Sequence, residues 1–486
     1  MTSRCWRHVL CGSAAMVALC VGARADVAIS NKATSNMSCD SGVCTATAKQ
    51  AVLNVGELQT MLGSGDLKVR SSSVAKDISI DQQFSWTSAS RLTLDAQQSV
   101  IVNKQVTVTG KGSLTVTTND VGNNGKSNKK NGGEFIVASR GSVQFWDLAS
   151  NLIIDGNSYA LVADLQTLAT GIAANRLGFF ALAIPYDASI DGTYTVAPIT
   201  TGFRGAFEGL GNEISNLSFN MSGANRYGLF AYVHKSGRVR NTRVHHAKFA
   251  GLGLGAGGIV SNNEGAIAYS SASAEYETHG CAGGLVCQNE GSIVSSHAVA
   301  RIHALSTNNV GAGGLAGYNS GTISGSYAEG SIAVRKSSEA NVGGLVSENA
   351  GVISNSYSLV AIADGRLNCC SSNFGGLVGL NLSGARISSS YSGGVFKLKN
   401  NETVSGGLIG FDSSTPGDIE SSYWDIDVGV SDPSQGAGNI LNDPGITGLT
   451  TKQFQKKLPN GFDPAIWGQA PNINNGYPYL LANPPR

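Results

Sequence analysis

The chain is poor in charge: Asp, Glu, Lys and Arg make up 14% of its 486 residues, against roughly 25% in an average soluble protein. Its formal net charge is +1, so it has no basic excess with which to hold nucleic acid. After residue 25, no apolar run is long enough to span a membrane. None of the seven histidines is followed by Glu, which excludes the His-Glu-x-x-His motif of zinc proteases.

Glycine, in contrast, is abundant, with 63 residues, and it forms part of a repeated phrase. Gly-Gly-Leu-Val or a close variant returns every 26 to 32 residues. The apolar marker residues of the seven copies are Leu229, Ile259, Leu285, Leu315, Leu345, Leu377 and Leu408. Repetition at about 30 residues is typical of a solenoid, in which each repeat buries its apolar face against the next.

Other positions recur in the same register. An Asn or Asp stands four residues after the marker, at Asn263, Asn289, Asn319, Asn349, Asn381 and Asp412. Each copy then has an Ile, at positions 267, 293, 323, 353, 387 and 419. Four residues after that Ile stand Ser271, His297, Tyr327, Tyr357, Tyr391 and Tyr423. Asn and Gly both tolerate the left-handed backbone of a sharp corner. We therefore predict that the six Asn/Asp side chains stack as a structural ladder at one corner.

The repeats predict strands rather than helices. Short apolar runs are separated by Asn and Gly, and no repeat carries a sustained 3.6-residue period. Ile353, Asn355 and Tyr357 are expected to alternate to one face of a strand, with Ser354 and Ser356 on the other. A β-propeller is disfavoured because each of its blades needs about 40–50 residues, which is longer than this repeat of about 30 residues. The prediction is an all-β parallel β-helix of about 30-residue coils, with a C-terminal cap.

Six segments are expected along the chain. Residues 1–25 resemble a secretory signal, with Arg4 and Arg7 before an apolar stretch and Ala23-Arg24-Ala25 as cleavage site, so the mature chain would start at Asp26. The remaining segments are an N-terminal segment or cap (26–75), N-terminal β-helix coils (76–142), a long-loop portion (143–227), the repeats (228–423) and the C-terminal cap (424–486). The N-terminal coils are read as earlier turns of the same β-helix. Helices are expected near 52–62, 164–174 and 451–458.

Two cysteines flank a turn. Cys39 and Cys44 enclose Asp-Ser-Gly-Val, and a disulfide between them is expected in an oxidising compartment. Cys281 lies three coil steps, about 14 Å, from Cys370, too far for a bond that needs about 4.4–6.8 Å between Cα atoms. The pairing of Cys281, Cys287, Cys369 and Cys370 stays open.

Residues that could carry chemistry recur in no shared register. His279, Cys281, Cys287 and His297 fit no common zinc spacing. Other titratable groups are interpreted as turn, cap or edge residues: Glu264, Glu290, Asp425, Asp427, His245 and His246. No catalytic residue, cofactor or metal is predicted.

The repeats resemble those of GLUG-motif proteins, and Gly376-Leu-Val-Gly379 and Gly407-Leu-Ile-Gly410 are near-ideal copies. Residues 53–62 and 78–116 are similar to the β-helical shaft of filamentous-haemagglutinin-like exoproteins, and residues 152–217 to the lead-in of such bacterial surface proteins. The resemblance implies a right-handed β-helix, secreted or on the cell surface and associated with adhesion. The Asn-Pro-Asn signature of two-partner secretion is absent, which leaves the periplasm open as a location.

Two functional classes follow. The first is an adhesin-like surface protein of a Gram-negative-type bacterium, which binds a host-cell, matrix or polysaccharide ligand through Ser/Thr/Asn-rich faces without catalysis. The second is a polysaccharide lyase or hydrolase on the same fold. Three or more convergent carboxylates in a groove would favour the enzyme, and flat polar faces the binding protein.

Overall fold

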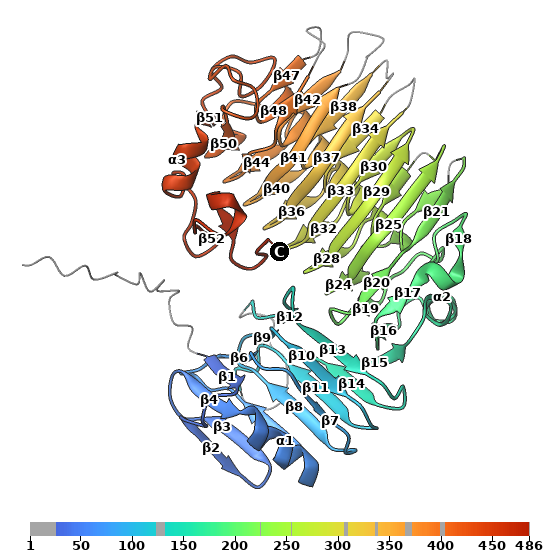
Figure 1. Cartoon of the computed structure of the whole chain (residues 1–486), viewed down its shortest axis with the longest axis vertical. Helices are drawn as coiled ribbons and strands as arrows, with labels where there is room; N and C mark the ends of the chain where they lie inside the picture. Colours follow the sequence, from blue (N-terminus) through green and yellow to red (C-terminus); the bar gives the residue numbers. More distant parts are fainter. Residues whose placement is uncertain are drawn as a thin grey trace, which may run out of the picture.

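The protein is built from stacked parallel coils (Figure 1). The computed structural model describes residues 26–122, 132–223, 225–253, 255–305, 310–335, 339–364, 372–398 and 404–485. The expected signal segment and Cys369 and Cys370 lie outside these residues. Strands pair in register with their equivalents one coil further on, as in Ile293↔Ile323 and Ile323↔Ile353. The predicted all-β, parallel β-helix is confirmed.

The strands of the repeats belong to four sheets, which we call the long, wide, glycine and asparagine sheets. The long sheet contains β2 (Met37–Asp40), β3 (Val43–Ala46), β5 (Leu67–Arg70), β8 (Arg91–Asp95), β11 (Ser113–Thr117), β14 (Asn151–Ile154), β15 (Asn157–Val162), β16 (Phe179–Leu182), β19 (Ala206–Glu208), β24 (Arg238–Arg240), β28 (Ala266–Ala268), β32 (Ser292–Val294), β36 (Thr322–Ser324), β40 (Val352–Ser354), β44 (Arg386–Ser388) and β49 (Ile419–Glu420). The wide sheet contains β17 (Tyr186–Asp187), β18 (Thr193–Tyr194), β20 (Glu213–Ser215), β21 (Ser218–Met221), β25 (Arg243–Gly251), β29 (Ser271–Thr278), β33 (His297–Ala304), β37 (Tyr327–Val334), β41 (Tyr357–Asp364), β45 (Tyr391–Ser392), β46 (Phe396–Lys397), β50 (Ser422–Asp425) and β51 (Ile446–Leu449).

Two narrower sheets complete each coil. The glycine sheet contains β22 (Arg226–Tyr227), β26 (Gly255–Gly257), β30 (Cys281–Gly283), β34 (Val310–Gly313), β38 (Ala340–Gly343), β42 (Asn373–Gly375) and β47 (Val404–Gly406). The asparagine sheet contains β23 (Phe230–Val233), β27 (Val260–Asn263), β31 (Val286–Asn289), β35 (Ala316–Asn319), β39 (Val346–Asn349), β43 (Val378–Asn381) and β48 (Ile409–Asp412). One coil therefore runs through the glycine, asparagine, long and wide sheets in turn.

Residues 26–154 form a first β-helix with a hydrophobic core of its own. Besides its part of the long sheet it has a five-stranded sheet of β12 (Phe135–Val137), β9 (Val100–Val102), β6 (Asp77–Ile80), β1 (Asp26–Ser30) and β4 (Ala51–Asn54), and a three-stranded sheet of β13 (Ser142–Phe145), β10 (Gln105–Val108) and β7 (Phe84–Trp86). Strand β1 lies between β4 and β6. The β2–β3 hairpin, which is closed by the Cys39–Cys44 disulfide, forms the outer edge of the long sheet.

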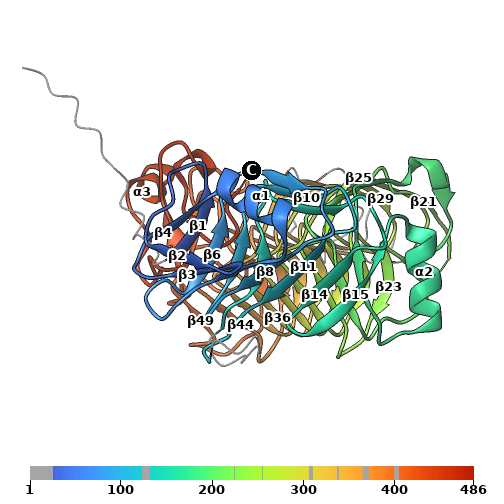
Figure 2. The same cartoon turned by 90° about the horizontal axis from the view of Figure 1, so that it is seen from below.

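The chain reverses between the two β-helices. Strands β14 and β15 pair antiparallel around the turn Asp155-Gly156, and both turn residues have positive φ. Such two-residue turns suit the twist of a hairpin. Beyond the turn the strands of the long sheet again pair in parallel with one another, but they run in the opposite direction to the strands before the turn. Figure 2 shows β8, β11, β14 and β15 side by side across this reversal.

This reversal moves the core to the other face of the long sheet. In β16, Phe179 and Ala181 pack on the core of the first β-helix, and Phe180 and Leu182 belong to the second core. The connection between two parallel strands of one sheet strongly favours a single handedness. When the strand direction is reversed, a β-helix of the same handedness must therefore wind over the opposite face of the long sheet. The expectation of one continuous β-helix is therefore wrong: residues 78–116 belong to a separate helix, and the break lies at Asp155-Gly156.

Three helices lie outside the coils, in the places expected from the sequence. They are α1 (Val55–Ser64), α2 (Leu165–Ala174) and α3 (Thr451–Lys456). Each begins at a side-chain cap, provided by Asn54, Asp164 and Thr450. Among the described residues, none of the helices could cross a bilayer.

A sharp corner separates the long and wide sheets. One residue per coil has a left-handed backbone there, with φ between 46 and 57°: Tyr269, Ser295, Gly325, Asn355, Ser389 and Ser421. The expected alternation of Ile353, Asn355 and Tyr357 to one face is wrong for this reason. The turn at Asn355 sends Ile353 into the core, while Tyr357 lies on the outer face of the wide sheet.

The C-terminal segment does more than close the end of the solenoid. Trp424, Ala437 and Ile446 do complete the second core, as a cap should. From α3 onward, however, the chain packs sideways on the wide sheet, over the stacked rings of Tyr327, Tyr357 and Tyr391 and over Tyr423. It includes the short hairpin of β52 (Trp467–Gly468) and β53 (Tyr479–Leu480). Among the residues that the structure describes there are also two short 3-10 helices, Ala188–Asp191 and Asn474–Gly476.

The structure places all six ladder residues in one column. Each Nδ2 donates to the next side-chain oxygen at 2.7–2.9 Å, from Asn263 through Asn289, Asn319, Asn349 and Asn381 to Asp412. All six are at most 3% exposed. Backbone amides satisfy further acceptors, as Gly351 does for Asn349 Oδ1 at 3.3 Å. Burying an amide side chain costs little free energy only while all of its hydrogen-bond partners are present.

Replacing Asn349 by Leu should lower the free energy of unfolding by roughly 1–3 kcal/mol, because Asn319 Nδ2 and Asn381 Oδ1 both lose a partner. Urea unfolding of the purified variant measures this. Asn220→Leu, at an exposed strand position, is the matched control. Equal destabilisation by the two substitutions would show that the ladder contributes nothing specific.

Candidate functional site

The polar rows of the second β-helix fall into buried and exposed sets. The buried set includes a serine column that the sequence analysis did not identify. In it Ser296, Ser326, Ser356 and Ser390 each accept from the backbone N–H of the preceding coil's residue at 3.1–3.3 Å. They are fully buried and therefore structural. A recurring Ser one position before the Ser/His/Tyr column was the available signal.

The exposed set lies on the outer face of the long sheet. Ser324, Ser354 and Ser388 are in register on neighbouring strands, and Thr322, Val352 and Arg386 form a parallel row. All six are half-buried or exposed. Adjacent strands lie about 4.8 Å apart. This part of the sheet therefore presents a flat, regularly spaced and mostly polar surface.

A groove of about 570 Å³ lies on the outer face of the wide sheet, over β25, β29 and β33. His245 and His246 lie at a bulge in β25, where the pairing register with β29 shifts, and their ring centroids are 3.9 Å apart. They were expected in a loop or at an edge, but β25 is paired on both sides. The bulge, which sequence periodicity does not show, brings both imidazoles to one surface.

The groove has charged groups in register. Lys248, Glu275 and Arg301 follow one another across the three strands. Arg301 Nη1 lies 3.3 Å from Glu275 Oε1, but both side chains are more than half exposed, so this ion pair contributes little stability. The groove offers hydrogen-bonding groups and side chains of both charges.

Both ends of this groove are tied down. At one end Arg243 donates to the carbonyl oxygens of Gly211 and of Ala138 in the first β-helix, at 2.7 and 2.5 Å. At the other end His297 Nδ1 lies 2.9 Å from Oδ1 of Asn483 in the C-terminal segment. The groove is thus the part of the wide sheet between these two contacts.

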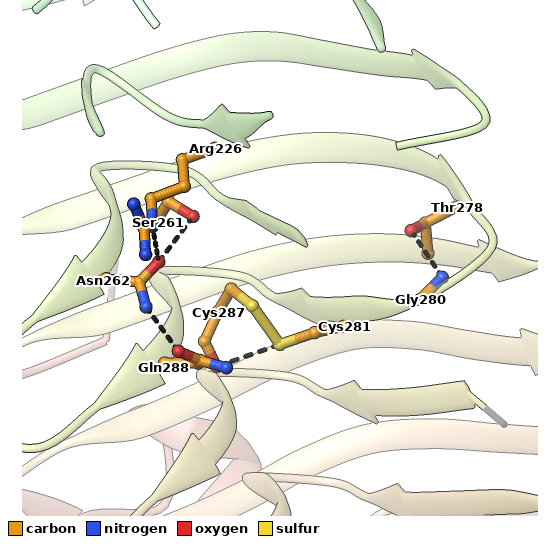
Figure 3. Close-up of a disulfide and its surroundings, with 8 residues drawn as sticks. All are labelled: Arg226, Ser261, Asn262, Thr278, Gly280, Cys281, Cys287 and Gln288. Atoms are coloured by element: carbon orange, nitrogen blue, oxygen red, sulfur yellow. Dashed lines mark hydrogen bonds between the residues drawn. A yellow bond between two sulfur atoms is a disulfide. The ribbon is translucent and has the colours of Figure 1, made fainter. Parts of the chain in front are cut away.

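Three of the four residues considered for a metal, Cys281, Cys287 and His297, have other partners. Cys281 and Cys287 form a disulfide across the corner between β30 and β31, and His297 is hydrogen-bonded to Asn483 (Figure 3 shows the disulfide). Within the parts of the chain that the structure describes, no group of three or more His, Cys, Asp or Glu could hold a metal ion. Beside the disulfide, Arg226 Nε donates to Asn262 Oδ1 at 3.0 Å, and Asn262 in turn donates to Gln288.

Three of the other acidic candidates accept hydrogen bonds from neighbouring groups of the fold. Glu264 accepts from the Tyr232 hydroxyl, and this bond holds the pKa of its carboxyl below the usual value. Asp425 is buried and accepts from Tyr477 and Thr451 at 2.6 Å each, so it anchors the C-terminal segment. Asp427 accepts from the Thr451 backbone at 2.9 Å.

Carboxyl groups do meet at the junction of the two β-helices. A cavity of about 650 Å³ is lined by Glu134 and Asp155 from the first helix and Glu208 and Arg240 from the second. Burial raises the pKa of Glu208 to about 7, although Arg240 opposes the shift. Burial also raises the pKa of Asp155. The sequence analysis missed this cluster because its members lie far apart in the chain.

Comparisons with known proteins add little. No family model and no curated protein matches the chain. Among solved structures, a Bacteroides ovatus protein provisionally described as an immunoglobulin A1 protease is similar, with 19% identity and a TM-score of 0.44, over 67% of this chain and 93% of that one. A likeness at this level carries no argument about activity.

The Cys281–Cys287 disulfide should be replaceable without loss of the fold. The equivalent positions one coil earlier are Gly255 and Ser261. The double variant Cys281→Gly, Cys287→Ser should therefore fold, with a free energy of unfolding lower by roughly 2 kcal/mol because a short loop is no longer closed. Guanidinium denaturation measures it. Under reducing conditions the double variant and the wild type should have the same free energy of unfolding. A difference that persists would show that packing, and not the disulfide, causes it.

Glu208 should make stability depend on pH. Its raised pKa means that the folded state keeps a proton that the unfolded state releases at about pH 4. The stabilisation is therefore complete below about pH 4 and is lost as pH rises through about 7. Glu208→Gln should remove this part of the decline between about pH 4 and 7, measured by urea unfolding, and Glu420→Gln on the same sheet should not. Parallel pH profiles for wild type and Glu208→Gln would contradict the assignment.

Proposed function

We propose that this protein is an extracellular, adhesin-like binding protein of a Gram-negative-type bacterium, and that it acts through its surface without catalysis. The two disulfides support an oxidising compartment. The predicted signal segment and the resemblance to GLUG-motif and filamentous-haemagglutinin-like proteins support secretion or display at the cell surface. Its ligand is a host-cell, matrix or polysaccharide component.

The observation that carries this proposal is the outer face of the long sheet. Ser324, Ser354 and Ser388 repeat one hydrogen-bonding group on consecutive coils. A polymer with its own repeat can contact several coils at once, and the weak contacts then combine into a useful affinity. A rigid stack of strands holds these groups in place, so that binding orders few protein side chains.

The test is adhesion of beads coated with the protein to immobilised matrix proteins and polysaccharides. The variant Ser324→Lys, Ser354→Glu, Ser388→Lys places an alternating Lys-Glu-Lys row on the long sheet. The control Tyr318→Lys, Leu380→Lys creates the same row around native Glu348 on the asparagine sheet. Adhesion should fall at least about tenfold in the first variant only. Equal adhesion of the two variants, or no adhesion of wild type to any surface, would refute the proposal.

A carbohydrate-active enzyme is the second candidate, and the junction cavity favours it. Glu134, Asp155 and Glu208 all line the cavity, and paired carboxyl groups with different pKa values are the usual catalytic groups of glycoside hydrolases. Incubation with a panel of polysaccharides distinguishes the two functions. Turnover that disappears in Glu208→Gln would establish the enzyme, and its absence with every substrate would favour the binding protein.

A further inference from the structure

The cavity between the two β-helices has the walls of a ligand site. Strand β12 of the first helix faces β19 and β24 of the long sheet (Figure 1). The volume of about 650 Å³ lies within the range of about 300–1,000 Å³ that is common for small-molecule sites. It forms where the repeat pattern is interrupted, and residues of both β-helices line it.

The walls are held rigidly. Arg240 Nη2 lies 2.5 Å from Glu134 Oε2 across the junction. Asn241 Nδ2 donates to Glu208 Oε2 at 2.8 Å and to the Phe135 carbonyl at 3.2 Å, while its Oδ1 accepts from the Val137 amide at 2.9 Å. The site is therefore preorganised, so binding does not have to order its side chains.

One buried pair within these walls is incompletely bonded. Arg240 Nε is buried and makes no hydrogen bond, and Glu208 Oε1 lies 3.5 Å from it. Because Arg240 Nε has almost no accessible surface, it lies within the wall and keeps its ion pair with Glu208 there.

The other walls combine aromatic and charged groups. Tyr159 and Phe179 pack edge to face, 5.4 Å apart, and both line the cavity. Tyr269 lies beneath the Arg240 guanidinium, 5.6 Å away. The carboxyl groups of Glu134, Asp155 and Glu208 are opposed by the guanidinium groups of Arg238 and Arg240, so that the lining has little net charge.

We propose that the cavity binds a neutral, hydroxyl-rich ligand of the size of a short saccharide. Aromatic rings accept the C–H faces of sugar rings, carboxylates accept from their hydroxyl groups, and guanidinium groups donate to them. The near balance of charge argues against uronic acids. This site is separate from the flat surface proposed for adhesion and does not depend on it.

The test is isothermal titration of the purified full chain with maltotriose, cellotriose, xylotriose, mannotriose and chitotriose, with trigalacturonate as the charged comparison. At least one neutral trisaccharide should bind with a dissociation constant below about 1 mM, and trigalacturonate more weakly. Failure of every neutral trisaccharide to bind, or tighter binding of trigalacturonate, would overturn the proposal.

Two matched variants locate the site. Ala268 lines the cavity, and Ser354 lies in the same row of the long sheet, outside the lining. Ala268→Trp should weaken binding at least about tenfold by filling the space, whereas Ser354→Trp should leave it unchanged. Thermal unfolding checks that both fold, and the pair Ala268→Leu and Ser354→Leu, which adds less volume, takes their place with the same expected outcomes if the tryptophan variant does not fold. Binding that survives Ala268→Trp, or is lost equally in Ser354→Trp, would place the saccharide elsewhere.

Discussion

The structure depends on in-register stacking, in which a side chain lies on its own equivalent from the neighbouring coil. This constraint favours residues that bond or pack well with copies of themselves. An amide is both donor and acceptor, so Asn289 can accept from Asn263 and donate to Asn319. Aromatic rings stack in the same way, and the His297–Tyr327 and Tyr327–Tyr357 ring pairs are nearly parallel, with centroids 4.7 and 4.8 Å apart.

The same constraint explains where the chain varies. At the concave corner between the glycine and asparagine sheets, a Cβ at Gly317 would come within 2.4 Å of the Cys281 sulfur. The position of Cys287 carries only small residues in the neighbouring coils, Ser261 and Gly317. The Cys281–Cys287 disulfide occupies a place that Gly311 and Gly317 hold one coil later. Outward positions on flat sheets carry no such restriction. A change of ligand can therefore be accommodated there without a change of fold.

The repeated part of the fold could be predicted because its evidence is local and repeated. The coil length, the strands and the three helices all follow from spacing and capping residues. Two errors arose where a single residue changes direction: Asn355 turns the chain through a left-handed conformation, and Asp155-Gly156 reverses it. The Asp-Gly pair between two apolar runs is a known hairpin signal. The sequence analysis did not use this signal.

The junction cavity could not be found from repeats, and the reason is physical. Stacked equal coils repeat every outward group, so they create rows rather than enclosed sites. An enclosed site needs a break in the repetition, and the Asp155-Gly156 reversal supplies it by bringing β12 of one helix against β24 of the other. Glu134 and Arg240 are 106 residues apart and share no repeat position. The two proposals follow this division: the regular coils present rows that match an extended ligand, and the junction encloses a space that matches a small one.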